Sequence, residues 1–273
     1  MRINEFASFI ATLAEKSGEI IKRSYLAENV DVELKADATL VTQADRAAEA
    51  LMRELIRKTY PEHGVIGEEY GEENARAEFV WTLDPIDGTV SFASGCPLFG
   101  TLIGLIHQNQ PVLGAIHQPL WNELCIGDGK RTLVNGRPVQ LRTVSRIANA
   151  TLLTTDVSCI RRTRHREAFE LLLERSHLFR TWGDCYGYLL VASGRADIML
   201  DLDMRIWDIV PLIPVITGAN GIITSWSGDD TSQSKSCLAT NSSLHPKVME
   251  ILAGQEWAGL THAGRDMLLS SKA

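Results

Sequence analysis

The spacing of the apolar runs changes near residue 145, and this change constrains the fold more than any other feature. Before it, short β-type runs follow one another closely, at 64–66, 79–83, 101–107, 111–117 and 123–127. The spacing of the last three runs, with turn residues at Asn109-Gln110 and Pro119, predicts an antiparallel meander. Asn135-Gly136 adds the signal of a tight hairpin of type I′.

Two helical patterns precede these strands. Apolar residues recur at helical spacing over about residues 4–26, which predicts an amphipathic helix with one face on a core. A second helix is predicted to begin after Thr42, a suitable N-cap, and to end at Pro61. The N-terminal part of the chain therefore combines helices with a mostly antiparallel sheet.

After residue 145, strands and helices alternate. Strand-like runs are predicted at 150–155, 178–181, 198–200, 221–226 and 236–240. Helices are predicted between them, at about 164–176, at about 184–193, from Asp208 and after Ser243. We expect an α+β subdomain over 1–145 and an α/β subdomain over 146–273, with the tail from Gln255 left open.

Composition and charge exclude several classes of protein. The net charge of −7 disfavours a nucleic-acid partner, because binding to a phosphate backbone needs a basic face. The arginines between 161 and 166 are interpreted as a solvated loop and helix start. Five scattered cysteines favour reduced thiols. Without a signal-like start or a long apolar stretch, a cytoplasmic protein with no membrane partner is expected.

The segment 81–89, Trp-Thr-Leu-Asp-Pro-Ile-Asp-Gly-Thr, is an apolar strand that ends in two aspartates. Pro85 holds its own φ at about −65° and keeps Asp84 extended. Gly88 permits a turn that a side chain would obstruct. The carboxylates of Asp84 and Asp87 can therefore converge at the end of the strand. Oxygen ligands of this kind suit Mg²⁺.

Two other acidic sites have similar settings. Glu68 and Glu69 follow the apolar run 64–67, and Asp208 stands where a helix is predicted to begin. If Glu68, Asp84, Asp87 and Asp208 shared a pocket without a cation, repulsion and desolvation would cost several kcal/mol per buried charge. A bound metal would resolve this conflict.

Each of these motifs alone has an ordinary structural interpretation. An isolated D-P-x-D-G is often only a turn. Glu68-Glu69 alone would be a solvated loop, and Asp208 alone would be an N-cap. The ordered combination of several acidic strand and helix ends is what favours a metal site.

With these residues in view, the chain resembles the inositol monophosphatase-like superfamily of magnesium-dependent phosphatases, from about residue 5 to 254. The resemblance lies in four motifs in order: 40–45, Gly67–Glu69, 81–89 and Trp207-Asp208. It implies a layered αβαβα sandwich of the inositol monophosphatase and fructose-1,6-bisphosphatase type. Val210 and Pro211 depart from the small residues usual after the second signature, and we interpret Pro211 as lying in a first helical turn.

The resemblance also implies roles for site residues. Two or three Mg²⁺ ions would be held by Glu68, Asp84, Asp87, Asp208 and the Ile86 carbonyl, with Asp84 bridging and Glu69 near a third ion. Either the Thr89-Asp45 pair or Glu68 would activate the attacking water. Gly88 and Thr89 would open a helix that receives the phosphate. Lys35 is a further candidate near the pocket.

The substrate must be inferred from another segment. The run 182–188, W-G-D-C-Y-G-Y, resembles the histidinol-phosphate phosphatase branch of the superfamily. Asp184, Cys185 and Asp201 would then contact the substrate, and the two acids would complement its amine and imidazole. If Asp184 only caps a helix, an inositol-1-monophosphatase is the alternative. A metabolite-binding relative without turnover is a third hypothesis, and a homodimer is expected from the resemblance.

Overall fold

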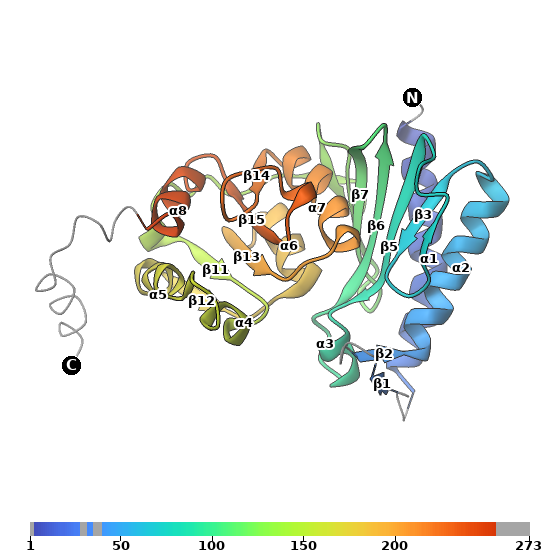
Figure 1. Cartoon of the computed structure of the whole chain (residues 1–273), viewed down its shortest axis with the longest axis horizontal. Coiled ribbons are helices and arrows are strands. Elements are labelled where there is room, and N and C mark those ends of the chain that lie inside the picture. The colour runs from blue at the N-terminus through green and yellow to red at the C-terminus, as the bar shows by residue number, and fades with distance from the viewer. Residues whose placement is uncertain (1–2, 28–31, 35–39, 255–273) are drawn as a thin grey trace, which may run out of the picture.

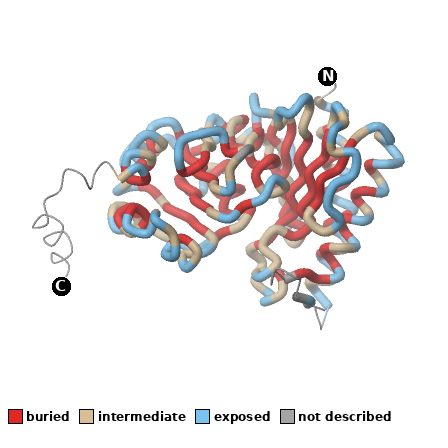
Figure 2. The backbone as a smooth tube through the Cα atoms, viewed as in Figure 1, coloured by how far each residue is buried: buried red, intermediate tan, exposed pale blue. Residues whose placement is uncertain are grey.

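Helices and sheets alternate in five layers across the molecule (Figure 1). The structure is a computed structural model that describes residues 3–27, 32–34 and 40–254. Buried residues concentrate on the strands and on the helix faces that meet them (Figure 2). Over these described ranges, no helix combines the length and the apolar character that crossing a bilayer requires.

The first layer is a pair of helices, α1 (Ile3–Tyr25) and α2 (Gln43–Thr59). Their apolar faces bury Ile10 and Met52 against the neighbouring sheet. Thr42 is the N-cap of α2, and it forms a capping box with Asp45, whose carboxylate accepts the Thr42 N–H at 2.8 Å. Both predicted helices are confirmed, and so is the N-cap.

The second layer is an eight-stranded sheet in the order β10-β9-β8-β7-β6-β5-β3-β4. Its strands are β3 (Gly64–Gly67), β4 (Gly71–Glu73), β5 (Phe79–Asp87), β6 (Gly100–His107), β7 (Gln110–Gln118), β8 (Glu123–Gly127), β9 (Thr132–Val134) and β10 (Arg137–Val139). The predicted meander is confirmed over β6, β7 and β8, and the antiparallel order extends to β5 on one side and to β9 and β10 on the other. β3, however, runs parallel to β5.

Two hairpin turns test the predicted turn positions. Asn135 and Gly136 have φ of 47° and 76° between β9 and β10, which fits the predicted I′ hairpin. In the β6–β7 hairpin the turn residues are Gln108 and Asn109, with φ of 50° and 63°, so the prediction of Asn109-Gln110 is wrong by one residue. The reason is the register, because His107 pairs with Gln110 and leaves two residues for the loop.

The third layer consists of α6 (Asp184–Ala192) and α7 (Ile206–Gly218), which lie between the two sheets. α7 lies very close to the first sheet, over a row of glycines at 104, 114 and 127 that are paired in register. A Cβ on Gly114 would overlap the Pro211 carbonyl oxygen, and one on Gly127 would overlap that of Pro214. The missing side chains therefore let the helix backbone contact the sheet directly.

α7 begins two residues earlier than predicted, at Ile206. Arg205 is its N-cap, and the Asp208 carboxylate accepts the Arg205 N–H at 2.7 Å. Pro211 therefore lies in the second turn, and the prediction of a first-turn proline is wrong. The helix tolerates Pro211 and Pro214 because its buried packing outweighs the hydrogen bonds that the prolines cannot donate.

The fourth layer is a five-stranded sheet in the order β12-β11-β13-β15-β14. Its strands are β11 (Thr151–Leu153), β12 (Leu178–Arg180), β13 (Ile198–Leu202), β14 (Gly221–Thr224) and β15 (Ser236–Asn241). β11 is parallel to β12 and β13, whereas β15 is antiparallel to β13 and β14. α5 (Arg166–Arg175) and α8 (His245–Leu252) cover its outer face as the fifth layer.

Several short elements complete the fold. β1 (Val32–Leu34) pairs with β2 (Leu40–Thr42), α3 (Thr89–Ala93) follows β5, and α4 (Val157–Arg161) follows β11. Of these, a helix opening after Gly88 and an extended run over 30–34 were predicted, and β1 confirms the second over its described residues. The layers together agree with the predicted αβαβα sandwich, and the chain crosses from the first sheet to the second between Val139 and Thr151. The division into two subdomains stays a prediction.

Candidate active site

The C-terminal end of β5 presents two carboxylates to one side of the sheet. Asp84 pairs with Leu102 and Asp87 with Gly100, and the register with β6 shifts between them. At this irregularity the Thr101 hydroxyl donates to the Pro85 carbonyl at 2.8 Å. Gly88 then turns the chain at φ 92°, a value that a side chain disfavours. The strand end thus has the geometry that its sequence predicts.

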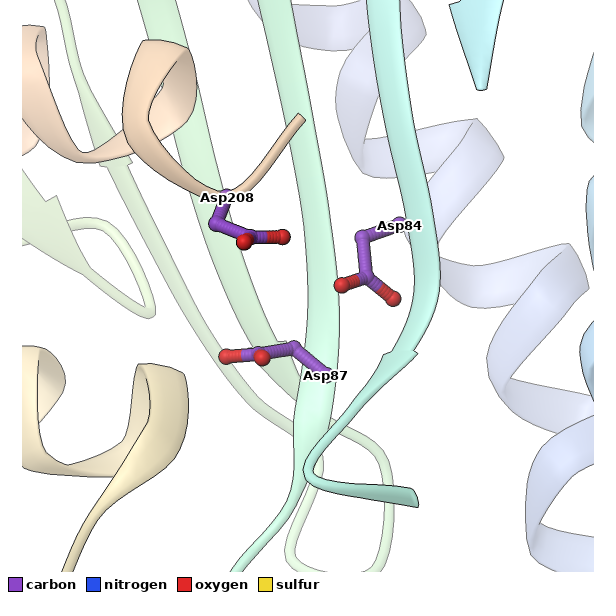
Figure 3. Close-up of side chains that lie close together, drawn as sticks. All are labelled: Asp84, Asp87 and Asp208. Atoms are coloured by element: carbon purple, nitrogen blue, oxygen red, sulfur yellow. The ribbon is translucent and has the colours of Figure 1, made fainter. Parts of the chain in front are cut away.

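A third carboxylate reaches the same place from α7. One carboxylate oxygen from each of Asp84, Asp87 and Asp208 lies within 4.8 Å of the other two, and the three side chains point toward one another (Figure 3). Asp208 lies in the first turn of its helix, and the glycine row of the sheet allows that helix to come this close. Residues separated by more than a hundred positions therefore form one acidic cluster.

The cluster is electrostatically unfavourable without a cation. Asp84 is only 2% exposed, and its Oδ1 has no hydrogen-bond partner. Burial raises the pKa of Asp84 well above its usual range, and the nearby Glu68, Asp87 and Asp208 raise it further. Burial, followed by the charge of Asp87, also raises the pKa of Asp208 well above normal. These shifts express repulsion that a cation would relieve.

The pKa of Asp87 rises less, to about 6. Burial raises it, and hydrogen bonds from Cys185 lower it, including the Cys185 N–H at the start of α6. Cys185 itself is buried, and burial raises the pKa of its thiol well above the usual range, so the thiol stays neutral. Cys185, predicted to contact substrate, supports Asp87 in this structure.

The donor set fits Mg²⁺. One pocket is lined by Glu68, Ile86 and the three aspartates, so it brings together the ligands that the sequence predicts. The Glu68 N–H bonds to the Leu83 carbonyl at 3.1 Å, which places Glu68 beside Asp84. Carboxylate and carbonyl oxygens are the ligands that hard divalent cations prefer, and a neutral thiol is not.

Asp45 and Thr89, the predicted water-activating pair, have other partners in this structure. The Thr89 hydroxyl donates to the Ile86 carbonyl at 3.1 Å. One Asp45 oxygen accepts from Thr42, while its Oδ1 is buried without a partner. Burial raises the pKa of Asp45 to about 6. Thr89 also opens α3, which has only five residues, so local N–H groups contribute more there than a helix dipole.

A second pocket, of about 300 Å³, adjoins the cluster and shares Asp87 and Asp208 with it. Asp184 and Asp201 both line it, as predicted for the substrate end. The Asp201 carboxylate accepts the Thr155 N–H at 2.9 Å, and burial raises the pKa of Asp201 to about 7. Burial raises the pKa of Asp184 well above normal, and the negative charges of Asp87 and Asp201 raise it further.

Asp184 does not cap α6. The N-cap position belongs to Gly183, which makes no side-chain capping bond, and Asp184 is the first residue of the helix with φ 51°. A Cβ on Gly88 would lie 2.9 Å from the Asp184 carboxylate, so the two pockets meet at these residues. The capping interpretation of Asp184 is therefore wrong.

The structure adds site residues that the sequence did not indicate to us. Thr155, Asp156 and Asp203 line the second pocket, and Arg205 and Trp207 line the first. Two of these residues, Thr155 and Asp156, follow β11, and Asp203 follows β13. Asp84 was identified because it is a polar residue at the end of an apolar strand, and the same criterion would have identified these three. Lys35 lies outside the described residues.

Comparison with known proteins identifies relatives along almost the whole chain. The inositol monophosphatase family model matches residues 3–256. A chloroplastic bifunctional phosphatase of Arabidopsis thaliana is 37% identical over 270 residues, which are 93% of this chain and 76% of that protein. A histidinol-phosphatase of Chlorobaculum parvum is 36% identical over 217 residues, which are 79% of this chain and 84% of that protein.

A solved structure is also similar throughout. That of an inositol monophosphatase from Zymomonas mobilis has a TM-score of 0.82 and 30% identity, and the similarity covers 93% of this chain and 99% of that one. The sequence similarity and the structural similarity to this family thus both extend over the two sheets.

Proposed function

Because the chain belongs to the inositol monophosphatase family, and so is a phosphoric monoester hydrolase, we propose that it hydrolyses histidinol phosphate to histidinol and phosphate with Mg²⁺. The observation that carries the proposal is the acidic second pocket beside the three-aspartate cluster. Its described lining includes six aspartates and no lysine or arginine. A pocket with this charge favours a substrate whose non-phosphate end is cationic.

Five groups would hold the metal: the carboxylates of Glu68, Asp84, Asp87 and Asp208, and the Ile86 carbonyl. The buried, unpartnered Oδ1 of Asp84 supports this assignment, because it is the group with most to gain from a cation. Two or three ions are proposed. When bound, Mg²⁺ supplies positive charge that stabilises the phosphoryl and leaving oxygens. It also lowers the pKa of the attacking water.

The chain's own residues would handle the proton of the attacking water. Asp45 suits a general base, because its raised pKa of about 6 lies near neutral pH and its Oδ1 is free to accept a proton. Thr89 could connect the water to Asp45 by rotating its hydroxyl away from Ile86. Glu68, which lines the metal pocket together with Thr89, is the alternative base. N–H groups at Gly88 and Thr89 would receive the phosphate.

Recognition of histidinol would depend on Asp184 and Asp201. The substrate has an amine that is cationic at neutral pH and an imidazole that becomes cationic near its pKa. A cation near Asp184 would relieve the repulsion from Asp87 and Asp201 that raises its pKa. The Chlorobaculum parvum histidinol-phosphatase, 36% identical, supports the same substrate.

Inositol 1-phosphate is the second candidate substrate. The structural likeness to the Zymomonas mobilis inositol monophosphatase, at 30% identity, favours it. An uncharged cyclitol would, however, leave the acids of the second pocket without a counter-charge. We therefore place it second.

The deciding experiment measures phosphate release from histidinol phosphate, inositol 1-phosphate and other phosphomonoesters, with Mg²⁺ and with excess chelator. We expect the highest kcat/KM for histidinol phosphate and no turnover with chelator. A preference for inositol 1-phosphate would overturn the substrate assignment alone. Full activity in chelator would overturn the metal assignment, and release from no substrate would favour a binding protein without turnover.

A further inference from the structure

A buried ion pair on α2 lies outside the active site and has no part in the chemistry proposed above. The Glu49 side chain is fully buried, and its carboxylate accepts the Arg53 Nε at 2.8 Å. Only 8% of the Arg53 side chain is exposed. Burying such a pair is costly, and stability alone is a weak explanation for it.

The contacts of this pair converge on the chain segment just after β3. The Glu49 carboxylate also accepts the N–H groups of Glu69 and Tyr70, at 2.8 and 3.2 Å. Arg53 donates to the Gly71 carbonyl through its Nη2. Glu49 and Arg53 therefore bind both the N–H and the C=O groups of one tight turn.

The absence of a side chain at Gly67 shows how close the contact is. A Cβ at this position would overlap Glu49 Oε1 and would lie 2.9 Å from Arg53 Nη2. The backbone of the Gly67-Glu68-Glu69 segment thus lies directly against the ion pair. On its other side, the Glu68 N–H bonds to the Leu83 carbonyl, next to Asp84.

We propose that Glu49 is a positioning residue for the metal site: it holds the turn that carries Glu68 and Glu69, and so sets where these carboxylates stand relative to Asp84. The inference rests on the metal-dependent function proposed above. Groups that orient metal ligands without touching the metal often matter for affinity by about 10- to 100-fold. Glu49 would act in this way through the backbone.

The test compares Glu49→Gln with wild type in Tb³⁺ binding, followed by luminescence sensitised by Trp207, which lines the metal pocket. Gln keeps the size of Glu49 but turns an NH₂ group toward two backbone N–H donors or toward Arg53. We expect Tb³⁺ affinity to fall at least tenfold. We also expect the Mg²⁺ concentration for half-maximal activity to rise similarly, with kcat largely recovered at saturating Mg²⁺.

Asp197→Asn is the matched control. Asp197 is also a buried acid that accepts a backbone N–H, from Thr151 at 2.7 Å, and pairs with an arginine, Arg142. It precedes β13, at the opposite end of that strand from Asp201. Asp197→Asn should lower the melting temperature of the metal-free protein as Glu49→Gln does, yet leave Tb³⁺ affinity within twofold of wild type.

If Glu49→Gln does not fold, the double variant Glu49→Gln/Arg53→Met also removes the buried Arg53 charge, whose remaining acidic partner is the half-exposed Glu73 at 3.7 Å. This variant is held to the same tenfold threshold. A folded Glu49 variant that binds Tb³⁺ within twofold of wild type would overturn the proposal. Equal losses in the Asp197 control would overturn it as well, because they would show a general stability effect. A wild type that neither binds Tb³⁺ nor needs Mg²⁺ would instead refute the proposed function.

Discussion

Asp84 and Asp201 are buried on opposite sides of the active site, but their carboxylates differ in hydrogen-bond partners. On the side of the first sheet, Asp84 Oδ1 is buried without any hydrogen-bond partner. On the side of the second sheet, Asp201 Oδ1 accepts the Thr155 N–H and lies 3.3 Å from the Thr154 hydroxyl. The protein therefore provides partners for Asp201 that it withholds from Asp84.

This difference suggests what each side binds. The Oδ1 of Asp84, which has no protein partner, can give its lone pairs to a metal ion. The Oδ1 of Asp201 is held by N–H and O–H donors, so it has a fixed orientation and fewer free lone pairs. The free oxygen of Asp84 suits coordination, as do the remaining lone pairs of Asp87 and Asp208, which also accept backbone N–H groups. The held carboxylate of Asp201 suits recognition of a substrate group at a set position. Changes to either side of the site, to the metal and to the pH test this difference.

Replacing Asp84 should have the largest effect. Asp84→Asn removes the proposed bridging ligand, so kcat/KM should fall at least about 10³-fold, since bound metal supplies several kcal/mol of transition-state stabilisation. The variant should fold, and its metal-free melting temperature should equal or exceed that of wild type, because one repelling charge is gone. Retained Mg²⁺-dependent turnover would contradict the metal role of Asp84.

Replacing Asp184 should alter specificity and leave metal dependence unchanged. Asp184→Asn weakens a charge-assisted hydrogen bond worth ~1.5–3 kcal/mol, so the preference for histidinol phosphate over inositol 1-phosphate should narrow by about 10- to 100-fold. The Mg²⁺ concentration for half-maximal activity should stay the same. Steady-state kinetics with both substrates measures both quantities, and an unchanged ratio of kcat/KM would argue against a substrate contact.

Mg²⁺ should stabilise the folded protein through the first side of the site. At a concentration of about 100 Kd, binding adds ~2.7 kcal/mol, which raises the melting temperature by roughly 5–10 °C for a chain of this size. Chelator should remove the increase. Asp84→Asn should abolish the Mg²⁺-induced shift in melting temperature, and Asp201→Asn should retain it. Equal shifts in these two variants would contradict different roles for Asp84 and Asp201.

The pH dependence of the metal-free protein should show the smallest effect. The pKa of Asp201 is raised to about 7 and that of Asp87 to about 6. Above the ordinary aspartate pKa the unfolded chain has lost protons that the folded chain keeps, so stability falls as pH rises toward the folded-state values. Between about pH 5.5 and 7 these two aspartates together should lower the free energy of unfolding by roughly 2 kcal/mol.

Thermal melts with chelator across this range test the prediction. Asp201→Asn should flatten the curve, because Asn can keep an oxygen facing the Thr155 N–H but does not titrate. Buried histidines such as His117, whose pKa burial lowers to about 4, favour the opposite trend, and the comparison of wild type with Asp201→Asn cancels their contribution. A stability difference between the two proteins that does not change with pH would show that Asp201 is charged in the folded state.

Some of the site could be inferred from local sequence alone. The end of β5 at Asp84-Pro85-Ile86-Asp87-Gly88 is set by restrictions on φ and by side-chain volume, and both act within a few residues. The capping box of Thr42 and Asp45 is equally local. For these features the sequence was sufficient, and the predicted elements around them are confirmed.

Other features were decided only by tertiary structure. The start of α7, the partners of Asp201 and the hold of Glu49 on the turn after β3 depend on residues far apart in the chain. Pro211 and Pro214 would be expected from local propensity to end α7 early. The helix nevertheless continues to Gly218, because the glycines at 104, 114 and 127 let it pack against the sheet. Packing and burial are sums over distant contacts, so no local pattern contains them.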